Sequence, residues 1–207
     1  MGGDLTESPD GGHAVNDHHL IMGRLVDYIT GRIIDDTHDE RYRQKLARFL
    51  VNAKGYALTE ILGGRVVNVH AGKKYARVPI TYLIVVTGRE AMLIHYGPGS
   101  LVTRHRPALA LARLATPFQI PVVVVTNGEQ ADVLDGVSGK VRAAGLAHIP
   151  SREQLVSALR DYRWEPVNPR RVEMEARIVM AYEVDDRCPC DDSVCRLDKS
   201  TEGGAID

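Results

Sequence analysis

A run of apolar residues, Pro121-Val122-Val123-Val124-Val125, limits the folds open to this chain more than any other feature. Valine favours strands, and a strand without polar positions suits the interior of a sheet that is covered on both faces. The preceding stretch RHRPALALARLA is rich in alanine and leucine and follows Thr103, which predicts a helix capped by that threonine. Pro107 is tolerated near the first turn of such a helix. A helix that leads directly into a buried strand is typical of the crossover connection in an α/β sheet.

Three runs of β-branched and aromatic residues precede this helix and predict the rest of the sheet. They are RVVNVH, VPITYLIVV and AMLIHY, and the segments AGKK and TGRE between them have turn composition, so we expect a three-stranded meander. Upstream, Thr37 and Glu40 match a capping box, in which both side chains satisfy backbone donors at the start of a helix. Gly55 is placed to end that helix. Two apolar stretches around Thr30-Gly31 indicate a short hairpin before it.

The sequence after the apolar run predicts one more strand and then C-terminal helices. Asn127-Gly128 is a strong signal for a two-residue hairpin that leads into ADVLD. Ser151 begins a second capping pattern, and Asn168-Pro169 suit the N-cap and first position of a last helix. The expected fold class is therefore α/β, with a mixed central sheet flanked by helices, plus C-terminal helices.

A chain of 207 residues suggests one main domain with tails. We expect a flexible N-terminal tail at 1–22, the main domain at 23–165, a C-terminal helix at 166–184 and an acidic, cysteine-containing tail at 185–207. The longest apolar run is far shorter than the ~20 residues that cross a bilayer, so we expect no membrane partner. The cysteines are three and crowded together, which favours a reducing compartment and a cytoplasmic location.

Charge is unevenly distributed along the chain, although the formal net charge is only −1. Both ends are acidic, whereas residues 65–113 contain eight basic residues and one acidic residue, Glu90. This basic middle could contact the phosphates of a nucleic acid, in which case binding should weaken steeply with salt. The alternative is an ordinary solvated face. The candidate nucleic-acid-binding residues are Lys73, Lys74, Arg77, Arg104 and Arg106.

The cysteines Cys188, Cys190 and Cys195 are close enough together to bind zinc or an iron-sulfur centre, since thiolates are the soft ligands such groups prefer. Three thiolates are one ligand short of the usual set. A histidine or a second subunit could complete it, and the alternative is a thiol-bearing tail that binds nothing.

Local sequence between roughly Leu25 and Leu159 is similar to the N-terminal domain family of type I restriction enzyme R subunits, in its small stand-alone form. The stretches that carry the resemblance are DERYRQKLARFLVNAKGY, KKYARVPITYLIV, YGPGSLVTRHRPALALARL, IPVVVVTNGEQADVLD, GKV and GLAHIPSREQL. The resemblance implies a restriction-endonuclease-like fold for the main domain, within the PD-(D/E)xK nuclease superfamily, and a DNA-processing ancestry.

The resemblance also places the positions of a catalytic site. Nucleases of this superfamily hold Mg²⁺ with an aspartate at the second strand and a [DE]-x-K motif on the third, because Mg²⁺ prefers carboxylate oxygens. The corresponding positions in this chain are Thr81, Leu93 and His95. Glu40 resembles a helix carboxylate that assists in some members, although its capping role explains it equally well. Glu90 should lie on the face opposite Leu93 if the strand alternates regularly.

We therefore expect a nuclease fold with a degenerate catalytic motif that binds DNA or RNA without cleaving it. One alternative is a Mg²⁺-dependent DNA endonuclease whose active site has moved. A second alternative is a non-catalytic protein-interaction scaffold. A homo-oligomer is compatible with each of these functions, and Mg²⁺ is expected as a cofactor only if the chain is catalytic.

Overall fold

The computed structural model describes residues 21–185, and the predicted tails lie almost wholly outside this range, as do the three cysteines. The strands are β1 (Arg24–Val26), β2 (Ile33–Asp35), β3 (Ile61–Gly63), β4 (Val66–Ala71), β5 (Lys74–Pro79), β6 (Tyr82–Val86), β7 (Arg89–Tyr96), β8 (Val122–Thr126), β9 (Ala131–Asp135) and β10 (Val141–Ala144). The helices are α1 (His38–Asn52), α2 (Leu101–Ala115), α3 (Arg152–Leu159) and α4 (Pro169–Val179), which continues into a π-helical turn, η4 (Met180–Asp185). No helix in this part of the chain has the length and apolar character needed to span a membrane.

The central sheet has six strands in the order β10-β9-β8-β7-β6-β3. Only β7 and β8 pair in parallel, and α2 connects them as the crossover helix that the sequence predicts. Side chains of β8 alternate between the two faces of the sheet, and both sets are buried: Val123 and Val125 face one apolar cluster and Val124 faces the other. The expected α/β class with a mixed central sheet is therefore confirmed.

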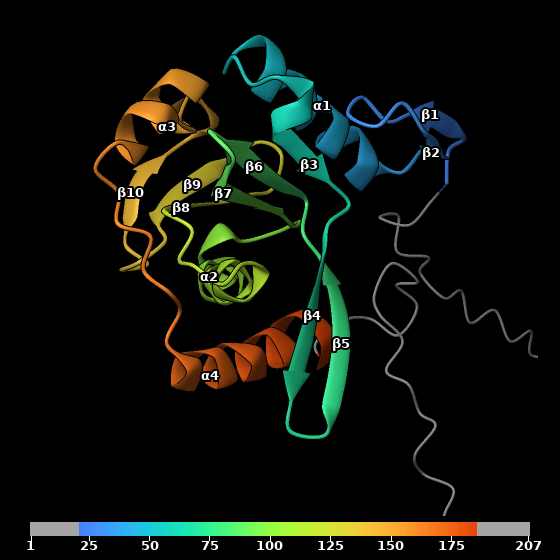
Figure 1. The fold of residues 1–207 in the computed structure, drawn as a ribbon. Coiled ribbons are helices and arrows are strands. Elements are labelled where there is room, and N and C mark those ends of the chain that lie inside the picture. The colour runs from blue at the N-terminus through green and yellow to red at the C-terminus, as the bar shows by residue number, and fades with distance from the viewer. Residues whose placement is uncertain (1–20, 186–207) are drawn as a thin grey trace, which may run out of the picture.

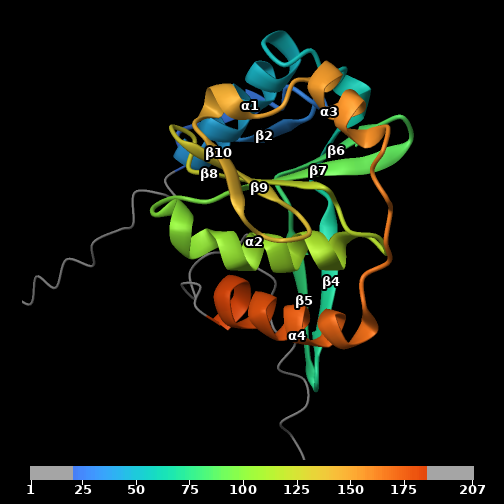
Figure 2. The same ribbon diagram turned by 90° about the vertical axis from the view of Figure 1, so that its left-hand side faces the viewer.

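Helices cover both faces of this sheet (Figure 1). α1 and α3 lie above it, and α2 lies below it, with α4 on the far side of α2 (Figure 2). The amphipathic side of α1 buries Leu46 and Leu50 against the upper face. On the lower face, Leu111 of α2 and Val179 of α4 belong to one continuous apolar cluster with Leu93 of β7. The lower face is thus covered by two helical layers.

The predicted three-stranded meander is wrong in one respect. The first run pairs with Lys74–Pro79, which begins before the second run and includes only its first two residues. These strands form the separate two-stranded ribbon β4–β5, while β3 occupies the edge of the central sheet. The second run is divided after Pro79, which has no N–H to donate, and resumes as β6 at Tyr82. The ribbon extends downward beside α4 (Figure 1).

Local capping chemistry sets the ends of the helices. Thr37 caps α1, and its Oγ1 accepts a hydrogen bond from the Glu40 N–H at 3.1 Å. The expected start of α2 at Thr103 is wrong, because the N-cap is Ser100 and Leu101 already packs into the core. Pro107 therefore lies inside this helix rather than at its start. Asn168 caps α4, as predicted from the Asn-Pro pair that begins it.

The turn between β8 and β9 is also longer than predicted. Thr126 pairs with Ala131, which leaves a four-residue loop instead of a two-residue one. Asn127 Oδ1 accepts hydrogen bonds from the N–H groups of Glu129 and Gln130, at 3.1 and 2.8 Å. Gly128 has a φ of +93°, the left-handed conformation that glycine adopts without strain.

Candidate functional site

The three positions that correspond to a nuclease motif meet at one end of β6 and β7. Thr81 immediately precedes β6, and its Oγ1 accepts a hydrogen bond from the N–H of Tyr96 at 2.9 Å. Leu83 pairs with Leu93, and Tyr82 pairs with Ile94, so Thr81 lies beside the end of β7 that carries His95. The backbone therefore brings together the residues that the resemblance places in one site.

Thr81 is partly buried, whereas the side chains of Leu93 and His95 lie beneath the sheet and are closed off from solvent. Leu93 is fully buried in the apolar cluster beneath the sheet. His95 is only 3% exposed, and its Nε2 lies 3.3 Å from Oε1 of Glu183, which is 2% exposed and belongs to η4. The geometry of that contact is not that of an aligned hydrogen bond, and within residues 21–185 neither ring nitrogen of His95 has one. The segment after α4 thus covers His95, which occupies the position of the lysine in the [DE]-x-K motif.

The donor set at this position does not fit the Mg²⁺ ion that the nuclease superfamily uses. Magnesium needs several hard oxygen ligands in octahedral geometry. The Thr81 hydroxyl is a neutral ligand that already accepts a hydrogen bond from backbone, Leu93 offers no ligand atom, and Glu183 contributes one carboxylate, which contacts His95. Among the described residues, no group of three or more His, Cys, Asp or Glu side chains is arranged to hold a metal ion. Cys188, Cys190 and Cys195 lie outside the described residues.

The two glutamates considered as substitutes have other positions. The Glu40 carboxylate accepts a hydrogen bond from Gln44 at 2.7 Å and pairs with Arg43 at 2.8 Å. These contacts replace the hydrogen bond from the Thr37 N–H to Glu40 that a capping box would contain. Glu90 lies near the start of β7, five residues and about 16 Å of strand from His95. The prediction that Glu90 faces away from Leu93 assumed regular alternation along β7. A register shift between Ile84 and Val85, opposite the beginning of β7, interrupts that alternation.

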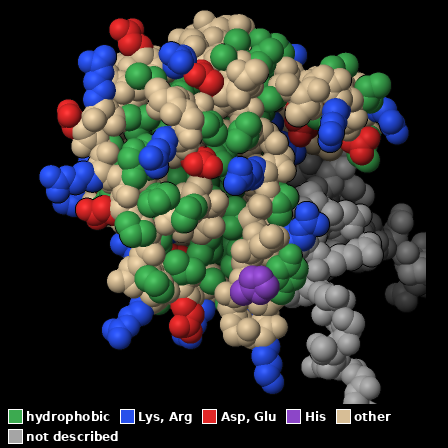
Figure 3. All heavy atoms as spheres, in the orientation of Figure 1, with side chains coloured by type: hydrophobic (Ala, Val, Ile, Leu, Met, Phe, Trp, Pro, Cys, Tyr) green, Lys and Arg blue, Asp and Glu red, His purple; other side chains and the backbone are tan. Residues whose placement is uncertain are grey.

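Three of the five candidate basic residues lie on the β4–β5 ribbon. Lys73 is in its turn, Lys74 and Arg77 are on β5, and all three are exposed. β5 alternates from Tyr75 onward, since Ala76 and Val78 are buried in the lower cluster while Tyr75 and Arg77 are exposed. At the lower end of the ribbon a basic side chain projects from the tip, and a histidine and a hydrophobic side chain lie side by side above it (Figure 3).

Aromatic and polar residues share the outward face of the ribbon with Arg77. The rings of His70 and Tyr75 pair across the two strands with centroids 4.7 Å apart. The Tyr75 hydroxyl donates a hydrogen bond to Asn68 Oδ1 at 3.1 Å, and Asn68 is the register partner of Arg77. A two-stranded surface therefore presents a basic group next to an aromatic pair and an amide.

The other two candidates lie on the first two turns of α2, and each has a hydrogen-bond partner within the protein. Arg104 Nε donates a hydrogen bond to the Pro98 carbonyl at 3.1 Å, and its guanidinium lies over Gly97, where a Cβ would come within 2.6 Å of it. Arg106 Nη1 pairs with Glu175 Oε2 of α4 at 2.5 Å. The five basic residues predicted as one set therefore lie on two different elements, three on the β4–β5 ribbon and two on α2.

A second site was not found from the sequence. A cleft of about 440 Å³ lies between α2, α4 and the turn after β9, and its wall contains Arg106, Arg113, Arg171 and Glu175. Burial opposes ionisation of Glu175, but hydrogen bonds and positive charge from Arg106 and Arg113 outweigh it and lower the pKa of the carboxyl. One sequence signal was available, because Arg106 and Arg113 are two helical turns apart and share a face of α2.

An α/β sheet of this order, with a crossover helix between its two parallel strands, defines the class of restriction-endonuclease-like proteins. The family model for the type I restriction enzyme R protein N terminus matches residues 38–150, more than half of the chain, and the protein belongs to this family. The match extends from the first residue of α1 to the segment just before α3. Neither the curated proteins nor the solved structures contain a match.

Proposed function

We propose that this member of the family binds duplex DNA through the β4–β5 ribbon and does not cleave it. The observation that carries the proposal is the outward face of the ribbon, where Arg77 lies in register with Asn68 and beside the ring pair of His70 and Tyr75. Tyr75 is 42% exposed, and Lys73 extends the same element at its tip. Basic groups suit phosphates, and planar groups with hydrogen-bonding edges suit bases.

The shape of the ribbon favours DNA over RNA as the partner. The major groove of B-form DNA is wide enough to admit a two-stranded β-ribbon. The major groove of A-form RNA is deep and narrow, so side chains on a ribbon would not reach its bases. Because the inward side chains Ala76 and Val78 anchor the ribbon to the lower cluster, its outward face would be presented in a fixed orientation.

The proposed lack of cleavage rests on the chemistry of the positions at the end of β6 and β7. Hydrolysis of this type needs carboxylates that hold a metal ion and activate water. Thr81 and Leu93 supply none, and His95 is enclosed with Glu183 beneath the sheet. A substrate phosphate would have to displace η4 to reach that point.

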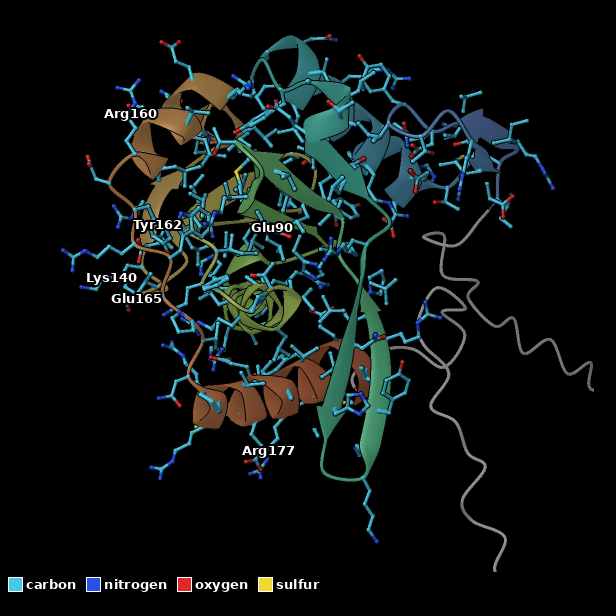
Figure 4. All side chains as sticks on the ribbon, in the orientation of Figure 1. Glu90, Lys140, Arg160, Tyr162, Glu165 and Arg177 are labelled. Atoms are coloured by element: carbon cyan, nitrogen blue, oxygen red, sulfur yellow. The ribbon has the colours of Figure 1, made fainter. Side chains whose placement is uncertain are left out.

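The test is fluorescence anisotropy of a labelled DNA duplex at about 50 and about 200 mM salt, using the wild-type protein and two charge-reversal variants. The slope of log K against log salt should become shallower by about 1 for each phosphate that the protein no longer neutralises. We expect Arg77→Glu to weaken binding and reduce this slope. The matched control is Arg160→Glu, because Arg160 is exposed on the α3 side, at the opposite end of the molecule from the ribbon (Figure 4).

Absence of binding at low salt would reject the proposal and favour a protein-interaction scaffold. Equal weakening in the two variants would mean that the ribbon is not the DNA-binding surface. A parallel incubation with plasmid DNA and Mg²⁺ or Mn²⁺ tests cleavage. Degradation that disappears in Glu40→Ala would show a relocated nuclease site instead.

A further inference from the structure

We propose that the cleft between α2 and α4 is a binding site for a phosphoryl group, held by the guanidinium groups of Arg106 and Arg171 over the buried Arg113–Glu175 pair. This site is separate from the β4–β5 ribbon, and the inference does not depend on DNA binding there. Its walls come from α2, α4 and the turn between β9 and β10.

Positive charge exceeds negative charge in this cleft. Three arginines converge on one carboxylate: Arg113 Nη1 lies 2.8 Å from Glu175 Oε1, Arg171 Nε lies 3.2 Å from the same oxygen, and Arg106 Nη1 reaches the other oxygen. His105 also lines the cleft, and its Nε2 lies 2.8 Å from Asp132 Oδ2. Counting Asp132 as well, the group retains a net positive charge with His105 in either protonation state.

The cluster also has more hydrogen-bond donors than acceptors. A guanidinium carries five N–H donors and no acceptor. Arg113 uses Nη1 on Glu175 and Nη2 on the carbonyl of Val137 at 3.1 Å, while its buried Nε has no partner within residues 21–185. Burial lowers the pKa of Arg113, and repulsion from Arg171 and Arg106 opposes the attraction of Glu175. An incoming anion would relieve this surplus.

The two outer arginines are placed to receive that anion. The side chains of Arg106 and Arg171 are 44% and 42% exposed, in contrast to 5% for Arg113. Arg106 uses Nη1 on Glu175 and Arg171 uses Nε, and no hydrogen bond within residues 21–185 involves Nη2 of Arg106 or either terminal nitrogen of Arg171. Paired N–H groups of guanidinium match the oxygens of phosphate in a two-pronged geometry that lysine does not offer.

The size and lining of the cleft indicate a phosphoryl group attached to something larger. A volume of about 440 Å³ exceeds the need of a bare ion, and Leu109 and Met174 add apolar wall beside the arginines. Met174 is 61% exposed, so the apolar side is open to a substituent. Such a group could come from a small organic phosphate or from the terminal phosphate of an oligonucleotide.

Calorimetric titration of the full chain with inorganic phosphate, at constant ionic strength adjusted with chloride, tests the site directly. We expect saturable binding with one phosphate per chain. Arg171→Gln should weaken it by about tenfold, since the variant cannot form a charge-assisted hydrogen bond at this position. The control is Arg170→Gln, because Arg170 is exposed on the same helix and does not line the cleft. Should Arg171→Gln fail to fold, Arg106→Gln provides the same test.

No saturable heat at about 10 mM phosphate, or equal weakening by Arg170→Gln, would overturn the inference. Two further titrations distinguish the sources of the phosphoryl group. Tighter binding of phenyl phosphate than of inorganic phosphate would support a small organic ligand. If a 5′-phosphate increases the affinity of a short oligonucleotide for the protein, and Arg171→Gln abolishes that increase, the ligand is the phosphorylated end of a nucleic acid. Binding of the unphosphorylated oligonucleotide reports on the ribbon alone, so the two proposals can fail independently.

Discussion

Replacement of Glu175 by glutamine should destabilise the protein more than any other single charge removal on α4. Glu175 is 1% exposed and offsets Arg113, whose side chain is 5% exposed. Removing one partner of a buried ion pair typically costs 3–5 kcal/mol, because the other charge stays buried without compensation. Glutamine keeps an oxygen acceptor, so the low end of that range applies, and we expect a loss of about 3 kcal/mol.

Thermal and urea unfolding of the full chain measure this loss. For a domain of this size 1 kcal/mol corresponds to about 2–4 °C, so the midpoint should fall by about 6–12 °C. Glu173→Gln is a matched control: Glu173 lies on the same helix and pairs with Arg177 at the same i,i+4 spacing that joins Arg171 to Glu175. That pair is exposed on the side of α4 away from α2 (Figure 4), and its removal should cost at most about 0.5 kcal/mol.

Equal losses of stability in the two variants would refute the reasoning. They would mean that the buried pair of Arg113 and Glu175 contributes no more to the free energy of unfolding than the solvent-exposed pair of Glu173 and Arg177. A larger loss in Glu175→Gln that is repaired by a second change, Arg113→Met, would support it further. The double variant removes both buried charges and leaves an apolar side chain of similar length.

Three further outcomes follow from the packing. Leu93→Asp should cost at least about 4 kcal/mol in urea unfolding, because it places an unpaired charge at a fully buried position, and near-normal stability would show that the lower face is open to water. Gly136→Ala should prevent folding or cost at least about 3 kcal/mol, since its Cβ would lie 1.8 Å from the Ile120 carbonyl oxygen, whereas Gly63→Ala should cost under about 1 kcal/mol. Folding lowers the pKa of Glu175 below its usual value of 4.5. The stability that its ionised carboxylate contributes is therefore fully present above pH 4.5 and is lost as the pH falls through the lower pKa of the folded state. Stability measured between pH 6 and about pH 3 should therefore fall less steeply in Glu175→Gln than in the wild type, and parallel curves would contradict this.

The order of elements was predictable wherever local chemistry and periodicity agreed. Thr37 and Asn168 are caps whose side chains bond to nearby backbone, so a few residues of sequence define the starts of α1 and α4. The buried strand β8 was predictable from an apolar run alone. β3 was not, because three residues are too few to show a period, and it forms only by pairing with β6.

The site was predictable in position but not in surroundings. The resemblance assigned Thr81, Leu93 and His95 to the motif positions of one site, and the hydrogen bond from the Tyr96 N–H to Thr81 joins the two segments that carry them. Glu183, which closes on His95, comes from a turn after α4, beyond the part of the sequence that resembles the family. The Arg113–Glu175 pair likewise joins residues 62 positions apart. Such contacts follow from the packing of helices on one another, which no short stretch of sequence encodes.

The position of α4 has a practical consequence for where this protein could be divided. Residues 38–150 match the family and leave out α4, yet Ala176, Val179 and Met180 are buried in the same cluster as Leu111. A fragment ending at the family boundary would uncover apolar side chains of α2 and of the ribbon, and we expect it to aggregate. In this chain the family match ends at residue 150, whereas the segment that forms the common core extends to α4.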